Sequence, residues 1–476
     1  MNKVAKNFLF VSVSNLLAQV IVFFTGTHYA KIIGKAAFGD ITTVQAIMTY
    51  LTLFVLFGLQ TYGTREIAKD KDNVPYIVGD TFAFRAMLLI FAAVVVFFIY
   101  ELLGIGGKNS SLRLILLVYA ITLIPAGMNI DWVYNGIQDM KYNAVYNIIK
   151  NIIPFILIYV FLKDKSQIYY IPLFTFIALV MGSMYQLYVY FFKEKFKIKV
   201  NLNGAKVRDY VNFGFPFLVS GILAMINGNV DRIIIEFTRS NAEAGIYSSA
   251  YYIINFLMNI ETMIFTVVFP LFISYYNNKD KKSLNKIVHK TTKIIVAVAA
   301  PFVLGGFILS KEIMVIFFGK SYAAAYAPFS ILLVYILILF IREVYGYGLN
   351  AWNMEKKYLK AVTISSLFNL IMNLIFTPLY GMNVAAFITV ISEVINLYMM
   401  RKFSQKVVKV DTIKYILNIL EPAIMMCVIT VLLKVLMVNA IVNIIVSAVI
   451  YLCSVFLSQY MTLDEVKDFL LRKNGV

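Results

Sequence analysis

Long apolar segments follow one another along almost the whole of this 476-residue chain. A helix needs about 20 consecutive apolar residues to cross the hydrocarbon core of a bilayer, and about fourteen segments meet this length. Because helices satisfy their own backbone hydrogen bonds in lipid, the pattern predicts an all-α integral membrane protein with about 14 transmembrane helices. The predicted spans begin near residues 8, 41, 81, 112, 146, 169, 211, 243, 290, 327, 359, 383, 416 and 440.

The two halves of the chain contain similar stretches in the same order. In the first half, GTHYAKII (26–33) precedes FGDITTVQA (38–46). In the second half, GNVDRIII (228–235) precedes AGIYSSAY (244–251), so Lys31 matches Arg232. This similarity indicates an internal duplication.

A second match, MKYNAV (140–145) with KKYLKAV (356–362), supports a duplicated unit of six spans. Since six is an even number, both copies have the same orientation in the membrane, and a substrate cavity is expected between them. We therefore predict a first six-helix lobe over 1–200, a second over 201–402, and two further helices with a cytoplasmic tail over 403–476.

The composition excludes a large soluble domain. Hydrophobic residues make up 61% of the chain and charged residues only 14%, against about 25% charged residues in globular proteins. The net charge of +18 comes mainly from alternate connectors, which hold 30 of the 43 Lys and Arg residues, while the opposite connectors hold 9. This asymmetry predicts that both termini are cytoplasmic, and it explains the charge without a nucleic-acid partner.

Motifs for enzymatic chemistry and for cofactors do not stand out. The sequence GKS (319–321) resembles the end of a phosphate-binding loop, but Met314 stands where that loop requires glycine. The two histidines and two cysteines have no metal-ligand spacing, and Cys427 and Cys453 are interpreted as small core hydrophobes. We therefore expect no catalytic residue, no metal and no cofactor.

Charged side chains inside the spans are costly and usually face a cavity or a partner. Arg232 is interpreted as lining a cavity, with movement to the interface or a buried ion pair as the alternatives. Lys31 could equally extend to the membrane surface, and His28 could be a packing residue. For Arg342 the alternative is neutralisation by nearby carboxylates, and for Arg65 an ordinary interface charge. The candidate substrate-binding residues are Arg232, Lys31, Arg342, His28, Asp231, Arg65 and Glu261.

Several short motifs, taken in order, resemble the polysaccharide (O-antigen type) flippases of the multidrug/oligosaccharidyl-lipid/polysaccharide exporter superfamily. The resemblance extends from about residue 1 to 400. The motifs are FGLQTYGTREIA (57–68), DWVYNGIQDMKY (131–142), NVDRII (229–234) with AGIYSSAY, FGKSY (318–322), and KKYLKAV continuing through Asn369 and Asn373 to YGMNVAA (380–386).

The resemblance implies two six-helix lobes around a cavity that opens to either side in turn. It implies a substrate in which a polyprenyl (undecaprenyl) pyrophosphate carries an oligosaccharide repeat unit, moved to the outer leaflet of the bacterial plasma membrane. The lipid bilayer, a coupling H⁺ or Na⁺ or the membrane potential, and other glycan-assembly proteins are the implied partners.

Two alternatives remain open. One is a small-molecule or drug exporter of the same superfamily, for which clustered carboxylates in one lobe are expected. The other is a membrane enzyme of glycan assembly, which would require a catalytic external loop.

Overall fold

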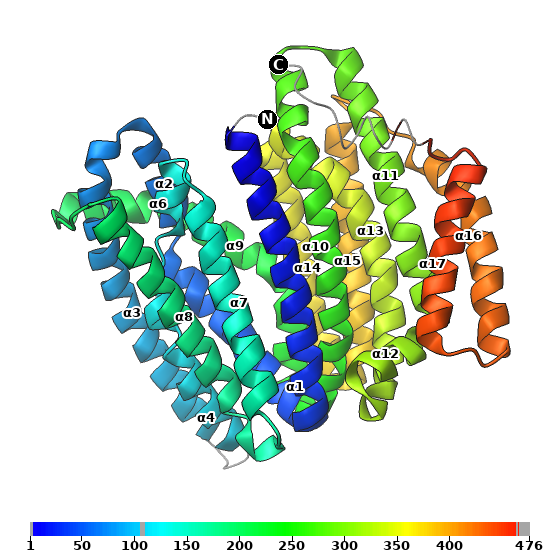
Figure 1. Ribbon diagram of the computed structural model, residues 1–476, viewed down its shortest axis with the longest axis horizontal. Helices are drawn as coiled ribbons and strands as arrows, with labels where there is room; N and C mark the ends of the chain where they lie inside the picture. The colour runs from blue at the N-terminus through cyan, green and yellow to red at the C-terminus, as the bar shows by residue number, and fades with distance from the viewer. Residues whose placement is uncertain (1–2, 105–109, 463–464, 466–476) are drawn as a thin grey trace. The chain divides into compact units, whose positions relative to one another are not determined.

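The computed structural model describes residues 3–104, 110–462 and 465, with side chains except at 3–16, 110 and 227 (Figure 1). Within these residues, 13 helices are long and apolar enough to cross a membrane. The first of them, Leu17–Lys69, contains two of the predicted spans because α1 (Lys3–Leu56) is broken at Gly34. Gly34 has φ 78°, a conformation that favours glycine. The predicted all-α membrane fold with about 14 spans is confirmed.

The remaining helices follow the predicted spans closely, and a short α2 (Leu59–Lys69) completes the second span. Their bounds are α3 (Val74–Gly104), α4 (Ser110–Ala120), α5 (Leu123–Gly127), α6 (Asp131–Gly136), α7 (Lys141–Phe161), α8 (Tyr170–Tyr188), α9 (Gly204–Thr238), α10 (Asn241–Asn277), α11 (Lys281–Ile308), α12 (Ser310–Phe318), α13 (Tyr326–Ala351), α14 (Glu355–Tyr380), α15 (Met382–Ser404), α16 (Thr412–Val435) and α17 (Ala440–Leu457).

Contacts between helices divide the chain into two compact units. The first comprises Met1–Ser248 and Asn373–Met382, and the second comprises Ser249–Met372 and Asn383–Val476. Helices α10 and α14 therefore contribute to both units. These units are defined by contacts between helices, whereas the lobes expected from the sequence are defined by the internal repeat. The two divisions are not equivalent, so the lobe boundaries stay a prediction.

In the first unit, two of the sequence motifs pack directly on each other. Gly63 of α2 lies against the indole ring of Trp132 in α6, so closely that a Cβ there would be 2.2 Å from the ring. Thr64 donates a hydrogen bond of 3.1 Å to the carbonyl of Trp132. The motifs at 57–68 and 131–142 therefore build a packed corner of the fold.

The two repeated stretches meet each other in the first unit at a crossing of α1 and α10. A Cβ added to Gly39 would lie 1.9 Å from the carbonyl oxygen of Asn241. A Cβ added to Gly245 would lie 1.8 Å from the carbonyl oxygen of Lys35. Only glycine permits backbones to approach this closely, as is common where membrane helices pack.

This crossing is symmetric in sequence. Thr42 donates a hydrogen bond of 2.9 Å to Ser248, and these residues are 206 positions apart. The two glycines have the same separation of 206, and so do Lys35 and Asn241. Equivalent positions of the two copies thus contact each other, which is the arrangement expected around a two-fold axis between repeats.

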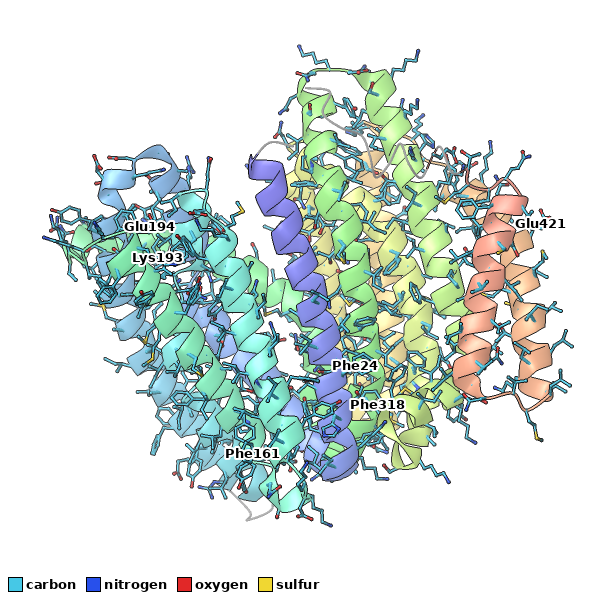
Figure 2. The ribbon with its side chains drawn as sticks, viewed as in Figure 1. Phe24, Phe161, Lys193, Glu194, Phe318 and Glu421 are labelled. Atoms are coloured by element: carbon cyan, nitrogen blue, oxygen red, sulfur yellow. The ribbon has the colours of Figure 1, made fainter. Side chains whose placement is uncertain are left out.

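Charged and aromatic side chains lie at the ends of several helices (Figure 2). Figure 2 shows Lys193 and Glu194 at one end of α8, and Phe161 near the other end of the adjacent α7. In the second unit, Glu421 lies near one end of α16 and Phe318 toward the opposite end of the helices. Such ends are typical of helices that cross a bilayer, where charges and aromatic rings collect near the interfaces.

We expect Gly39→Ala and Gly245→Ala to destabilise the protein by about 1–3 kcal/mol, because the new methyl group overlaps backbone atoms that cannot rotate away. Thermal unfolding of the detergent-solubilised protein should show lower melting temperatures for both variants. Gly305→Ala is the matched control, since a Cβ there meets only the Met426 side chain at 3.7 Å. Equal melting temperatures for all three variants would contradict the close crossing.

Candidate functional site

In the first unit, Asp231 of α9 is a buried carboxylate, and each of its two oxygens accepts a hydrogen bond. Tyr247 of α10 donates to Oδ2 at 2.7 Å, and the Asn373 amide of α14 donates to Oδ1 at 2.9 Å. Thr377 in turn donates to Oδ1 of Asn373 at 2.6 Å and orients that amide. The carboxylate is therefore held in place by side chains from two other helices, α10 and α14.

Arg232 follows Asp231 on α9 and points about 100° away around the helix. Its side chain is half-buried. Nη2 donates to the carbonyl of Gly228 at 2.8 Å and to Oδ1 of Asn229 at 3.1 Å. These neutral groups orient the guanidinium along its own helix.

A pair of carboxyl groups joins α1 to α9. Asp40 and Glu236 lie close enough for their carboxyl groups to interact directly. Ser111 donates to Asp40 at 2.8 Å, and Thr43 donates to Glu236 at 3.4 Å. Sequence reasoning did not select this pair, because nothing in the sequence links an acid at the start of one span to an acid at the end of another.

His28 and Lys31 lie one turn apart on α1. The His28 ring stacks on Tyr159 of α7, with ring centroids 3.7 Å apart and planes 10° from parallel. This stacking is the kind of contact that the packing alternative for His28 expects, and its place in a substrate site stays a prediction. Lys31 is exposed, and Lys163 is close enough for its charge to act on the same histidine.

Arg65 is exposed on α2, next to a Glu66–Lys69 ion pair of 2.7 Å. By contrast, Arg85 of α3 is entirely buried and was not among the selected residues. It donates to the carbonyls of Gly127 at 3.0 Å and Asn129 at 2.8 Å. These carbonyls lie at the break between α5 and α6, so Arg85 satisfies backbone groups that the broken helix leaves open.

In the second unit, Arg342 of α13 lies between two carboxylates. It forms ion pairs with Glu343 and with Glu393 of α15, which is almost fully buried. Glu261 of α10 is also buried, and its Oε1 has no hydrogen-bond partner among the described residues. It is close enough for the charges of Glu343 and Arg342 to act on it. The arrangement around Arg342 matches the neutralised alternative.

One guanidinium faces three carboxyl groups in this cluster, which we call the Arg342 cluster: Glu261, Arg342, Glu343 and Glu393. Full ionisation would leave an excess of negative charge in a weakly polar environment, at a cost of several kcal/mol per ion. The cluster therefore holds more carboxyl groups than its single guanidinium can neutralise. Within the described residues, no group of three or more His, Cys, Asp or Glu residues has metal-binding geometry.

Comparison with known sequences links the chain to glycan assembly. The family model described as polysaccharide biosynthesis protein matches residues 4–276. A probable low-salt glycan biosynthesis flippase of Haloferax volcanii is 21% identical over 396 residues, covering 82% of this chain and 81% of the relative. A putative O-antigen transporter of Escherichia coli is 21% identical over 383 residues, covering 79% of this chain and 90% of the relative.

Solved structures share the fold at low sequence identity. The lipid II flippase MurJ in an inward closed conformation aligns with a TM-score of 0.74 and 16% identity, over 98% of this chain and 100% of that one. An inward-facing multidrug resistance MATE family transporter of the MOP superfamily aligns with a TM-score of 0.62 and 14% identity. The alignment covers 83% of this chain and 95% of that one. The chain therefore shares the fold of these two proteins.

We expect Arg342→Met to lower the free energy of unfolding by about 3–5 kcal/mol, because it leaves buried carboxylates without their cation. The double variant Arg342→Met/Glu393→Gln should recover part of this loss. Arg239→Met is the control, since its ion pair with Glu243 is partly exposed and is worth about 1 kcal/mol or less. Melting temperatures in detergent measure all three, and no recovery in the double variant would contradict the pairing.

Proposed function

The chain belongs to the polysaccharide biosynthesis protein family, and we propose that it is a flippase that moves a lipid-linked oligosaccharide across the membrane. The family match over residues 4–276 carries this proposal. It is supported by relatives named as a glycan flippase and an O-antigen transporter, which align over most of both chains. On this basis the protein is a transporter and not an enzyme.

The substrate that fits best is a polyprenyl pyrophosphate carrying an oligosaccharide repeat unit, moving from the cytoplasmic to the outer leaflet of the plasma membrane. The distribution of Lys and Arg supports cytoplasmic termini. A membrane potential that is negative inside favours outward movement of an anion, by about 2.3 kcal/mol per charge per 100 mV. Passage through a cavity between two lobes stays a prediction from the sequence.

Arg232 is our first choice for the residue that binds the pyrophosphate. It is half-buried on a long membrane helix, and its Nη2 donates to a backbone carbonyl and to the amide oxygen of Asn229. Asp231 positions the same turn through Tyr247 and Asn373. Lys31, at the equivalent place in the first repeat, and Arg65, on α2, are proposed as further contacts.

The Arg342 cluster is our candidate for the coupling site. Its three carboxyl groups and one guanidinium favour uptake of a proton or a cation during the transport cycle. Carboxylates grouped in one part of the chain also favour the second candidate function, a small-molecule exporter driven by a cation gradient. The two functions share a coupling device and differ in their cargo.

We predict that the protein, reconstituted in liposomes, moves a fluorescent polyprenyl-pyrophosphoryl sugar between leaflets faster than protein-free vesicles. Arg232→Ala should slow this movement about 10–100-fold, since a hydrogen bond to a charged group contributes about 1.5–3 kcal/mol. Arg208→Ala is the matched control, an exposed arginine on the same helix. No movement by the unaltered protein would overturn the proposed function, whereas full activity of Arg232→Ala would overturn only the assignment of this residue.

We predict that an imposed pH gradient accelerates transport and that Glu261→Gln abolishes this acceleration, because a neutral amide cannot exchange a proton. Glu312→Gln, which removes a partly exposed carboxylate paired with Lys434, should keep the full response. The measurement is the initial rate with and without the gradient. An unchanged response in Glu261→Gln would exclude this carboxyl group from coupling. Extrusion of a cationic dye without sugar-lipid movement would favour the exporter.

A further inference from the structure

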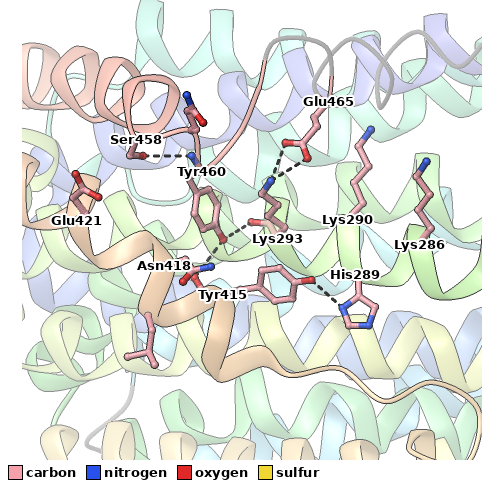
Figure 3. A pocket seen from close by; sticks show the side chains of 12 residues that line it. Lys286, His289, Lys290, Lys293, Tyr415, Asn418, Glu421, Ser458, Tyr460 and Glu465 are labelled. Atoms are coloured by element: carbon pink, nitrogen blue, oxygen red, sulfur yellow. Dashed lines mark hydrogen bonds and ion pairs between the residues drawn. The ribbon is translucent and has the colours of Figure 1, made fainter.

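The second unit contains a pocket of about 860 Å³ where α11 and α16 begin and α17 ends (Figure 3). It lies among the first residues of α11, the first turns of α16 and the segment that follows α17. In the proposed topology these ends lie at the cytoplasmic surface. The pocket is separate from Arg232 and from the Arg342 cluster, whose residues do not line it.

One wall of the pocket is strongly basic. Lys286, His289, Lys290 and Lys293 line it from successive turns of α11, a spacing that places them on one face of the helix. Figure 3 shows the three lysine side chains pointing in the same direction. The wall thus presents several positive charges to a single ligand.

The other walls supply hydrogen-bonding groups, and two of these are fixed in place by hydrogen bonds to α11. Tyr415 of α16 binds Nδ1 of His289 at 2.9 Å. Tyr460 is buried, and its hydroxyl donates to the carbonyl of Lys293 at 3.2 Å. Asn418 and Ser458 also line the pocket, and these neutral groups suit the ester and hydroxyl oxygens of a polar headgroup. Glu421 lines the pocket as well, so the pocket contains a second acidic side chain besides Glu465.

The chain places an oxyanion of its own in this pocket. Both carboxylate oxygens of Glu465 accept from Nζ of Lys293, at 2.8 and 3.1 Å. Burial acts to raise the pKa of Glu465, but hydrogen bonds from Lys293 and the Thr462 amide outweigh it and hold the pKa below its ordinary value. The contribution of this contact to stability is therefore present at neutral pH and is lost only as the pH falls through that lowered pKa. An incoming anion must compete with Glu465.

An apolar surface continues from the pocket along the neighbouring helices. Leu417 lines the pocket itself and is 59% exposed, and Ile424, two turns further along α16, is 58% exposed. On α17, Leu452 is 57% exposed. In a bilayer these side chains contact acyl chains. A ligand that combines a phosphate with acyl chains fits both the basic pocket and the apolar surface beside it. A soluble phosphate would contact only the pocket.

We propose that this pocket binds the phosphate headgroup of an anionic phospholipid, whose acyl chains lie along α16 and α17, and that Glu465 competes with the lipid for Lys293. Basic pockets between membrane helices on the cytoplasmic side suit anionic headgroups. The site does not depend on the proposed flippase activity. The assignment to the cytoplasmic leaflet rests on the proposed topology.

The experiment is native mass spectrometry of the purified full chain with phosphatidylglycerol or phosphatidylcholine. We expect selective retention of phosphatidylglycerol. The double variant Lys290→Gln/Lys293→Gln should weaken its affinity about 30-fold, because each lysine near an anionic group contributes about fivefold. Lys281→Gln/Lys282→Gln is the matched control, which removes two exposed charges from the start of the same helix without touching the pocket. Glu465→Gln should strengthen binding.

Three outcomes would overturn the proposal. Equal retention of both lipids would exclude recognition of the headgroup. Equal losses in the pocket and control variants would indicate a general charge effect. Displacement of phosphatidylglycerol by millimolar inorganic phosphate would identify a soluble phosphate as the ligand. Circular dichroism spectra that match the unaltered protein serve as the folding check for both double variants. Binding is measured without transport, so failure of one proposal does not affect the other.

Discussion

The cost of placing an ionised side chain in hydrocarbon determines how the interior of each unit is built. Such a group must find a partner, a proton or water. In the first unit Asp231 accepts hydrogen bonds from side chains of α10 and α14. Arg85 donates hydrogen bonds to two backbone carbonyls at the break between α5 and α6. In the second unit Arg342 forms ion pairs with two carboxylates. Helices distant in sequence are thus connected at the positions where the membrane tolerates charge least.

The glycine crossing of α1 and α10 adds a geometric constraint to this electrostatic one. Gly39 and Gly245 remove the side chains that would keep the backbones apart, and the Thr42–Ser248 bond connects the equivalent positions of the repeat. The same short motif therefore serves twice, once in each partner of the contact. If the chain arose by the predicted duplication, a glycine that suits one copy would already stand in the other, and a close symmetric crossing would be easy to produce.

The apolar pattern was sufficient to predict the helical class, the number of spans and their approximate bounds, because bilayer thickness sets helix length directly. The partners of the buried charges were much harder to predict. Glu343 is adjacent to Arg342 and visible as a neutralising group, but Glu393 lies 51 residues away. The Asp40–Glu236 pair and the interior position of Arg85 depend on tertiary packing, which periodicity does not reveal. His28 had both interpretations open, and its stacking on Tyr159 likewise depends on tertiary packing.

The basic connector before the ninth predicted span illustrates how one sequence feature can have two consequences. Its lysines contribute to the charge asymmetry that orients the chain, and this alone accounts for their number. Their spacing at 286, 290 and 293 has a second effect, since it gathers them on one face of α11 against α16 and the end of α17. Those last two helices lie outside the predicted repeat. A headgroup site at their junction with α11 would give these additional helices a role that the duplicated part of the chain does not supply.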